Sequence, residues 1–407
     1  MSIIQKWNSI SLVKRIVCGL IIGAILGLLI PHVKVIGILG TLFVGALKAV
    51  APILVFFLVI SSLCNAGKSH GGVIKTVIIL YMFSTVLAAV IAVFASMAFP
   101  VKMTLANAAT DTSAPQGIVE VLNNLLLNVV ANPVSSLVNA NYVGILMWAV
   151  LLGLAFRAAD KMTKKVLADV ADGISMVVTW IINLAPFGIF GLVFNTVSTN
   201  GLDIFTTYGK LLLLLVGCML FIYFVTNPLL VYWCIRQNPY PLIFQCLKRS
   251  ALTAFFTRSS AANIPVNMKV CEEMGLDRDT YSVTIPLGAT INMDGAAITI
   301  TVMTMATAFT LGIHVDIPTA IILSLLAALS ACGASGVAGG SLLLIPMACS
   351  LFGISDDISM QVVAVGFIIG VVQDSVETAL NSSSDLLLSA SAEFRQWRLE
   401  GKEIKFK

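Results

Sequence analysis

A short polar stretch interrupts one of the most apolar regions of the chain. Residues 286–297 read PLGATINMDGAA and lie between TYSVTI and ITITVMTMATAF. In lipid, every backbone polar group must be satisfied within the protein, so a broken helix is tolerated only where protein or a water-filled cavity surrounds it. An aspartate at membrane depth is costly to bury and is expected to be functional. We therefore expect Asp294 and the broken backbone beside it to belong to a binding site.

A second polar set lies on the last apolar segment. Residues at the spacing i, i+3, i+4, i+7 and i+11 share one helical stripe, and they are Asp374, Glu377, Thr378, Asn381 and Asp385. Each carboxylate inside a membrane span costs at least about 2.5 kcal/mol. A solvent-exposed helix end would account for Asp385 and the serines at 382–384, but not for Asp374. We expect the stripe to line a buried polar site.

The two sets have complementary chemistry. Asp294 and Asp385 are hard oxygen donors, and unwound backbone at 288–292 would free carbonyl oxygens. Such ligands suit a hard cation, which in a transporter indicates sodium. Asp374 and Thr378 suit an ammonium group and a hydroxyl or carboxylate. An α-amino acid fits this set, with its carboxylate held by Asn381 and by free amides at helix N-termini.

The composition is that of a membrane protein. Of the 407 residues, 58% are hydrophobic and only 11% are charged, against roughly 25% charged in soluble proteins. The net charge of +4 is modest and the basic residues form no nucleic-acid footprint, so no nucleic-acid partner is expected. Eight cysteines and three histidines show no metal-ligand spacing, which argues against a zinc site or a histidine-based triad.

Apolar runs long enough to span a bilayer, about 20 residues each, predict spans at 12–30, 37–66, 73–100, 142–157, 168–198 and 207–235. The region 117–157 is expected to hold two or three short pieces, after a polar loop at 101–117. Lysine and arginine gather in alternate loops, which predicts cytoplasmic N- and C-termini. No cleavage pattern follows the first run, so we expect it to remain as an anchor.

Beyond residue 240 two segments are too broken to be simple spans. Residues 241–274 turn at TRSSAANIP (257–265), and residues 318–352 turn at a Gly- and Ser-rich tip (330–341). Each predicts a hairpin that enters the membrane and returns, and long spans at 280–312 and 358–390 follow. Ordinary small-residue helix packing would explain one such tip, but two at matching positions indicate an inverted repeat with a midplane transport site.

Four motifs carry a resemblance to a known family. They are TRSSAANIP (257–265), GATINMDG (288–295), the Gly-rich tip at 333–340 and DSVETALNSSSD (374–385). Over essentially its whole length the chain resembles the sodium-coupled amino-acid symporters of the glutamate-transporter (dicarboxylate/amino acid:cation symporter) family. The resemblance implies an all-α polytopic membrane protein with eight transmembrane helices and two re-entrant helical hairpins in inverted repeats. It also implies a homotrimer.

The implied domains form a scaffold and a transport block. The scaffold comprises helices 1–2 (1–72) and 4–5 (117–204). The block comprises helix 3 with its loop (73–116) and residues 205–395, and a cytoplasmic tail follows at 396–407. The block would carry amino acid and sodium together by alternating access, with the hairpin tips as gates.

The resemblance also assigns residues to the substrate and to co-transported sodium ions. Substrate contacts are Asp374, Thr378, Asn381 and the backbone of the tips at Ser260 and Val337. Sodium sites are formed by Asp385 with carbonyls of Gly288, Asn292 and Asn381; by Thr290 with Ala331, Cys332 and Ala334; and by Asp294, Asn292, Tyr81, Ser84 and Thr85. Without the resemblance, the hydroxyls at 81–85 would be taken for groups that bond their own helix.

Departures from the family pattern indicate the substrate. Acidic-substrate members carry an arginine one turn after the first aspartate of the last span, where this chain has Glu377. The family commonly has threonine after NMDG, where this chain has Ala296. Glu377 would repel an acidic side chain, and it is available to a substrate hydroxyl or to Arg258. We therefore expect a small neutral amino acid, serine or threonine, as in the bacterial branch with that specificity, and hence the bacterial inner membrane. Arg258 is expected to pair with Asp374 or Glu377, unless it lies in cytoplasmic water.

Three other functions are weighed against this one. A proton- or sodium-coupled carrier of dicarboxylates or acidic amino acids would have the same fold, but Glu377 argues against it. An intramembrane aspartyl protease would use Asp294 and Asp374, but the chain has no GxGD-type motif and the protease leaves the paired hairpins unexplained. A passive channel would not need so closed a set of hydroxyl and carboxylate ligands. The chain is therefore not expected to be an enzyme.

Overall fold

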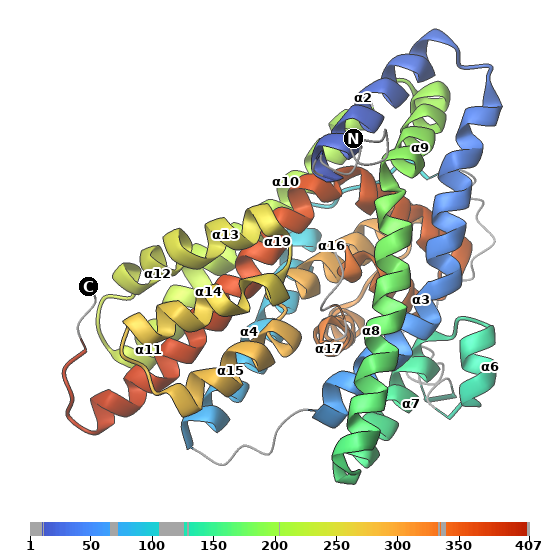
Figure 1. Cartoon of the computed structure of the whole chain (residues 1–407). Helices are drawn as coiled ribbons and strands as arrows, with labels where there is room; N and C mark the ends of the chain where they lie inside the picture. The colour runs from blue at the N-terminus through green and yellow to red at the C-terminus, as the bar shows by residue number, and fades with distance from the viewer. Residues whose placement is uncertain are drawn as a thin grey trace, which may run out of the picture.

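The computed structural model describes residues 10, 12–65, 72–105, 126–127, 130–202, 204–332, 334 and 339–404, and every regular element within these ranges is a helix (Figure 1). The longer helices are α2 (Leu12–Leu29), α3 (Gly37–Asn65), α4 (Gly72–Ala98), α7 (Tyr142–Ala155), α8 (Lys161–Asn183), α9 (Ala185–Asn200), α10 (Ile204–Phe221), α11 (Asn227–Ile235), α14 (Ser260–Glu273), α15 (Arg278–Ile291), α16 (Asp294–Thr310), α17 (Ile317–Ala331) and α19 (Asp356–Leu399). The shorter ones are α6 (Pro133–Val138), α12 (Tyr240–Cys246), α13 (Leu252–Thr257) and α18 (Ile345–Ser350).

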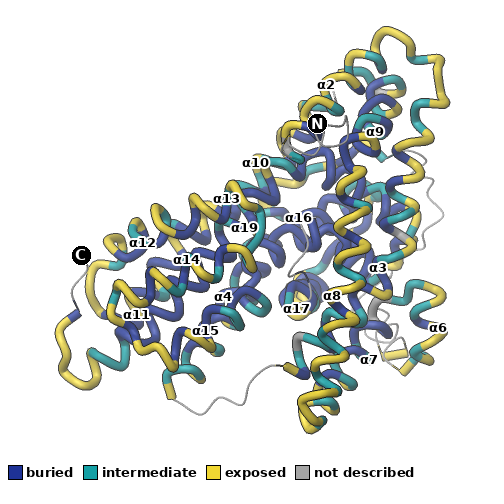
Figure 2. The backbone as a smooth tube through the Cα atoms, in the orientation of Figure 1, coloured by how far each residue is buried: buried dark blue, intermediate teal, exposed yellow. Residues whose placement is uncertain are grey.

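The helices form two groups. In one, α2 packs on α9, and α3 packs on α7, α8 and α9. In the other, helices α4 and α10 to α18 surround α19, which contacts most of them. Figure 2 shows that the buried backbone follows α19 and α16, while α8 and α2 expose one side. The polar stripe of the last apolar segment therefore lies at the centre of the second group.

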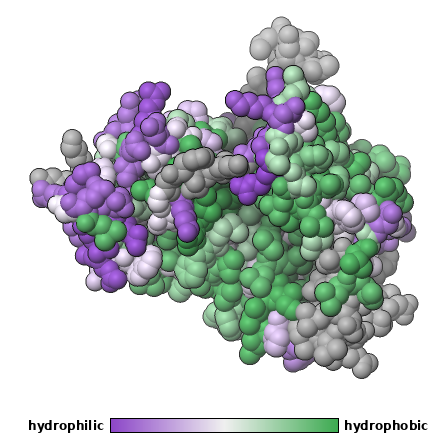
Figure 3. Space-filling model, turned by 90° about the horizontal axis from the view of Figure 1, so that it is seen from below, coloured by the Kyte–Doolittle hydropathy of each residue, from purple (hydrophilic) through white to green (hydrophobic). Residues whose placement is uncertain are grey.

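Many of these helices are apolar enough to cross a membrane. Six within the described ranges meet that criterion, at Lys34–Asn65, Gly72–Ala98, Lys161–Asn183, Phe205–Ile235, Arg278–Thr310 and Asp356–Leu399. Figure 3 shows hydrophobic side chains over much of one face, with hydrophilic ones gathered toward one side of the view. The chain is thus an all-helical membrane protein with several apolar helices.

One predicted span is wrong. The sequence predicted a single span at 168–198, but the structure has two helices, α8 and α9, which meet at Leu184. Pro186 at the second position of α9 has no N–H group to donate to α8, so the helix breaks at this point. The predicted span at 207–235 is continuous, with a π-helical turn at Ile222–Thr226 between α10 and α11.

In each segment that was predicted as a hairpin, a helix lies on either side of the predicted tip. In the first, α13 ends at Arg258, whose φ of +52° reverses the chain, and Ser259 caps α14 by accepting a hydrogen bond from the Ala262 N–H. In the second, α17 ends at Ala331, and the chain resumes after Gly339 in a short 3-10 turn (Gly340–Leu344) that leads into α18. Val337 lies outside the described residues.

The predicted break near Asp294 is also present. Helix α15 ends at Ile291, α16 begins at Asp294, and Asn292 has the non-helical dihedrals φ −99° and ψ 78°. The Asn292 N–H still donates to the Gly288 carbonyl at 2.9 Å, so α15 is complete up to the break. The break places Asp294 at the N-terminus of α16.

Candidate functional site

The polar stripe of α19 is buried throughout. Exposed fractions are 4% for Asp374, 6% for Glu377, 7% for Thr378, 3% for Asn381 and 1% for Asp385. The serines at 382–384 are also fully buried, which excludes a solvent-exposed helix end as their explanation. Charged and polar side chains this deep must be satisfied by partners, because an unpaired buried charge is very costly. Those partners define the site.

Asp374 is paired with the arginine of the first hairpin tip. The Arg258 Nε and Nη2 atoms both lie 2.6 Å from Asp374 Oδ2. The Gly339 N–H of the second tip donates to Asp374 Oδ1 at 3.2 Å. This carboxylate is therefore the point at which α19 meets both hairpin tips, and Asp374, rather than Glu377, is the partner of Arg258.

Asp294 is held by hydroxyl groups of α4. The Ser84 hydroxyl donates to Asp294 Oδ2 at 2.7 Å, and the Thr85 hydroxyl donates to Oδ1 at 3.1 Å. Thr85 also lies 3.0 Å from the Tyr81 carbonyl of its own helix. These hydroxyls thus do more than bond their own backbone, and the structure brings together the 81–85 segment and Asp294.

Asp385 lies beside the end of α15. The Asn292 Nδ2 group donates to Asp385 Oδ1 at 2.9 Å, and the Tyr81 hydroxyl donates to the Asp385 carbonyl at 2.9 Å. A Cβ atom on Gly288 would stand 2.8 Å from both Asp385 Oδ1 and the Tyr81 hydroxyl, so only glycine allows this approach. Asn292 Oδ1 is buried without a hydrogen-bond partner in the described part of the chain.

These contacts fit a hard cation. Within the described ranges no Lys, Arg or His forms an ion pair with Asp294 or Asp385, whose side-chain partners are neutral groups. No cluster of three or more His, Cys, Asp and Glu side chains in these ranges could hold a metal ion by itself. A cation here would need amide and carbonyl oxygens as further ligands, and the unpartnered Asn292 Oδ1 is one available oxygen.

The second hairpin tip approaches the end of α15. The Cys332 thiol donates to the Ile291 carbonyl with an Sγ–O distance of 3.7 Å, and the Ala334 N–H donates to the Ala331 carbonyl at 2.9 Å. The Thr290 hydroxyl donates to the Leu287 carbonyl at 2.7 Å, within its own helix. The structure thus places the tip containing residues 331, 332 and 334 against the segment that contains Thr290.

Asn381 links α19 to the start of α16. Its Oδ1 atom accepts a hydrogen bond from the Gly295 N–H at 2.7 Å, and its Nδ2 group lies 3.5 Å from the Met293 sulfur. One turn earlier, the Thr378 hydroxyl donates to the Asp374 carbonyl at 2.7 Å. Asn381 therefore lies between the Asp374 end of the stripe and the Asp385 end.

Glu377 is surrounded by neutral donors. Its Oε2 atom accepts hydrogen bonds from the Thr299 hydroxyl (2.7 Å), the Ser341 hydroxyl (2.8 Å) and Gln373 Nε2 (2.5 Å). Its Oε1 atom has no hydrogen bond among the described residues. These donors come from α16, from the return arm of the second hairpin and from α19 itself, so Glu377 joins three elements.

Comparison with known proteins identifies the family. Residues 12–393 match the model of the sodium:dicarboxylate symporter family. The chain is 60% identical over 399 residues to a Bifidobacterium adolescentis protein named "Serine/threonine transporter SstT", which covers 98% of this chain and 93% of that protein. The chain belongs to the sodium:dicarboxylate symporter family. The resemblance predicted from the four motifs is confirmed.

Other relatives of this symporter carry the same name. The protein from Streptococcus thermophilus is 56% identical over 97% of this chain and 98% of its own length. The protein from Streptococcus agalactiae is 57% identical over 96% of this chain and 97% of its own length. The family is one of transporters, so the chain is not an enzyme.

Sequence reasoning missed a polar cluster on another side of α19 in this symporter. Asn263 and Asn267 of the first hairpin donate to Ser382, at 2.8 Å to its hydroxyl and 2.8 Å to its carbonyl respectively. Asn227 of α11 donates to the Ser384 hydroxyl at 3.0 Å. The only available signal was the pair of motifs that contain Asn263, Ser382 and Ser384, and Asn227 and Asn267 lie outside them. Thr299 and Ser341 were missed because they lie 78 and 36 residues from Glu377 in the chain, whereas Gln373, four residues before Glu377 on the same helix, could have been found from helical spacing.

Proposed function

We propose that this protein imports serine and threonine together with sodium by alternating access. Glu377 carries the substrate assignment, because a buried acidic group one turn from Asp374 repels a substrate with an acidic side chain. Its Oε1 atom has no hydrogen bond among the described residues and would accept one from a substrate hydroxyl. Relatives that are 56% and 60% identical are named serine/threonine transporters, which supports the same function here.

The amino acid would bind between the hairpin tips and α19. Its ammonium group would bind Asp374 and share that carboxylate with Arg258, whose Nη2 atom lies 2.6 Å from Asp374 Oδ2. Thr378 and Asn381 would contact the amino-acid backbone. The tip amides at Ser260 and Val337 would bind the substrate carboxylate, because helix N-termini favour anions.

Sodium would bind at the other end of the stripe. One ion would be held by Asp385 with carbonyls of Gly288, Asn292 and Asn381. A second would use backbone oxygens of Thr290, Ala331, Cys332 and Ala334. A third would use Asp294 and Asn292 with Tyr81, Ser84 and Thr85. The absence of a cationic partner for Asp294 and Asp385 in the described ranges supports the first and third sites.

The proposed architecture is that of eight transmembrane helices and two re-entrant hairpins. The transport block would comprise residues 73–116 and 205–395, and it would move against a scaffold of 1–72 and 117–204. The separation into two helix groups supports this division. We further propose a homotrimer in the bacterial inner membrane, with both termini and the tail at 396–407 in the cytoplasm.

The function is tested by uptake into proteoliposomes that contain the purified protein. Labelled serine should accumulate against its gradient when sodium is present outside. Replacement of sodium by choline should abolish accumulation, and equal uptake in choline would disprove sodium coupling. Competition by a panel of amino acids then separates the alternatives, because a dicarboxylate or acidic-substrate carrier would be inhibited by aspartate rather than by threonine.

A further inference from the structure

An apolar groove lies between α4 and α10, away from the stripe of α19. It has a volume of about 870 Å³ and is lined on one side by the C-terminal half of α4, including Phe94, and by the residues just after it, including Phe99. On the other side it is lined by α10, including Leu213, Gly217 and Phe221. Phe94, Phe99 and Leu213 are 54%, 69% and 74% exposed. A Cβ atom on Gly217 would meet no atom within 4 Å, so the groove is open at this point.

A single cation lies among the lining residues. Lys210 is exposed, lies in the apolar segment Phe205–Ile235, and has no ion-pair partner within the described ranges. Lys102 follows Val101, which also lines the groove, and is exposed as well. A lysine near the end of a membrane helix extends its ammonium group toward the headgroup region, where it needs an anionic partner.

We propose that this groove binds an anionic phospholipid, with an acyl chain along Phe94, Leu213 and Gly217 and the phosphate on Lys210. The occupant must combine a long apolar part with a negative charge at one end. A free phosphate would leave the aromatic lining unfilled, and a zwitterionic lipid would bring a cation of its own that offsets its phosphate and weakens the contact with Lys210. The surrounding bilayer supplies molecules with both properties.

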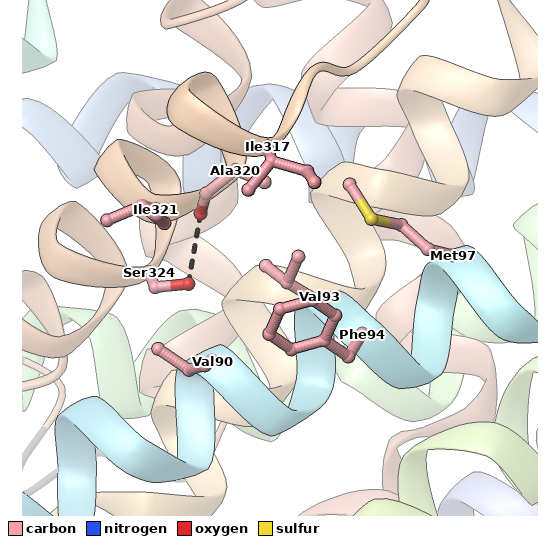
Figure 4. Close-up of a pocket in the computed structure, with 8 residues that line it drawn as sticks. All are labelled: Val90, Val93, Phe94, Met97, Ile317, Ala320, Ile321 and Ser324. Carbon is pink, nitrogen blue, oxygen red and sulfur yellow. Dashed lines mark hydrogen bonds between the residues drawn. The ribbon is translucent and has the colours of Figure 1, made fainter.

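The groove adjoins the second hairpin through one side chain. Phe94 also lines a small hollow between α4 and α17, where Val90, Val93 and Met97 lie opposite residues of the hairpin arm (Figure 4). The arm contributes Ile317, Ala320, Ile321 and Ser324, and the Ser324 hydroxyl donates to the Ala320 carbonyl at 3.0 Å. A bound acyl chain would therefore pack on α4 beside the contact that α4 makes with the hairpin, and should stabilise that contact.

The test is native mass spectrometry of the purified full-length protein with phosphatidylglycerol or phosphatidylcholine added. Wild type should retain phosphatidylglycerol about fivefold better than phosphatidylcholine, the ratio expected for one lysine beside a headgroup with a net negative charge, because choline offsets the phosphate charge of phosphatidylcholine. Lys210→Gln should remove this preference. Gly217→Leu should reduce retention of both lipids, because leucine fills the groove without a clash and is a better helix former than glycine.

Two matched controls come from the same helices. Gly209→Leu makes the same change in α10 at another glycine with open space around it, outside the groove lining. Lys75→Gln removes an exposed lysine at the opposite end of α4. Both should retain phosphatidylglycerol as wild type does, and thermal unfolding checks that all variants fold.

Two results would overturn the proposal. Equal retention of the two lipids by wild type would remove the anionic preference. Unchanged retention of phosphatidylglycerol by Gly217→Leu and Lys210→Gln would assign the groove to another occupant, such as a second copy of this chain. Neither outcome depends on whether the protein transports serine.

Discussion

The two ends of the buried stripe on α19 satisfy their carboxylates in different ways. Asp374 is paired with Arg258 of the first hairpin at 2.6 Å, so its charge is balanced within the chain. Asp294 and Asp385, at the other end, have hydroxyl and amide side-chain partners but no cation within the described ranges. The carboxylate at one end thus has a cationic partner within the described chain, whereas the two at the other end have only neutral ones.

This difference suggests how substrate and ion are coupled. At the Asp374 end, a substrate ammonium must share a carboxylate that already has a partner. At the other end, a bound cation would also fix the break between α15 and α16, from which the Gly295 N–H donates to Asn381. Asn381 is proposed to contact both the ion and the substrate. An ion that fixes the break would therefore also hold Asn381 in place for the substrate. Each ligand should then raise the affinity for the other.

The largest effect is expected from removing the charge of Asp294, at the end of the stripe whose carboxylates have no cationic partner in the described ranges. Asp294→Asn removes the charge but keeps the shape, and it should raise the sodium concentration for half-maximal serine uptake by about 100-fold or more, the upper range for perturbed metal sites. Asp279→Asn, at an exposed carboxylate in the first turn of α15, is the control. Wild-type sodium dependence in Asp294→Asn would show that this end needs no added cation.

The second prediction concerns the end that is already paired. Arg258→Gln leaves the buried Asp374 without its cation, which should destabilise the substrate-free protein by about 2 kcal/mol. Serine should restore much of this loss, because its ammonium group then supplies the charge. Thermal unfolding with and without serine and sodium measures both effects. Arg258→Lys, which keeps a charge, is the control, and an equal loss with and without serine would contradict a shared carboxylate.

Glu377 lies between the two ends of the stripe, and its hydrogen-bond donors are all neutral. Glu377→Gln replaces charge-assisted hydrogen bonds by neutral ones, a loss of about 1 kcal/mol or roughly fivefold in affinity. The KM for serine and threonine uptake should rise, whereas the KM for alanine, which has no hydroxyl, should not. Aspartate should also begin to compete. A uniform change for all three substrates would mean that Glu377 only holds α16 and the hairpin together.

The sequence predicted the stripe and the break correctly, because both rest on rules that act locally. Helical spacing places the polar residues from Asp374 to Asp385 on one face. A broken helix in a membrane is tolerated only where protein or a water-filled cavity surrounds the unpaired backbone groups. The split at Leu184 was not predicted, because the apolar composition continues through it. Pro186 is compatible both with one kinked span and with two separate helices. The partner of Arg258 was left open because hairpin and helix are 116 residues apart in the chain. Such pairings depend on tertiary packing, which spacing does not encode.

The smallest effect is expected on the third side of α19, where the hydrogen bonds join neutral groups only. Ser382→Ala removes the hydroxyl that accepts from Asn263, while the Asn267 bond to the Ser382 carbonyl remains. Asn263 also keeps the Ser250 hydroxyl at 3.0 Å, so the loss in unfolding free energy should be only about 1 kcal/mol. Sodium dependence and the KM for serine should stay as in wild type. A shift in sodium dependence would mean that this cluster also takes part in ion binding, and the contrast between the ends of the stripe would then extend to a third group of residues.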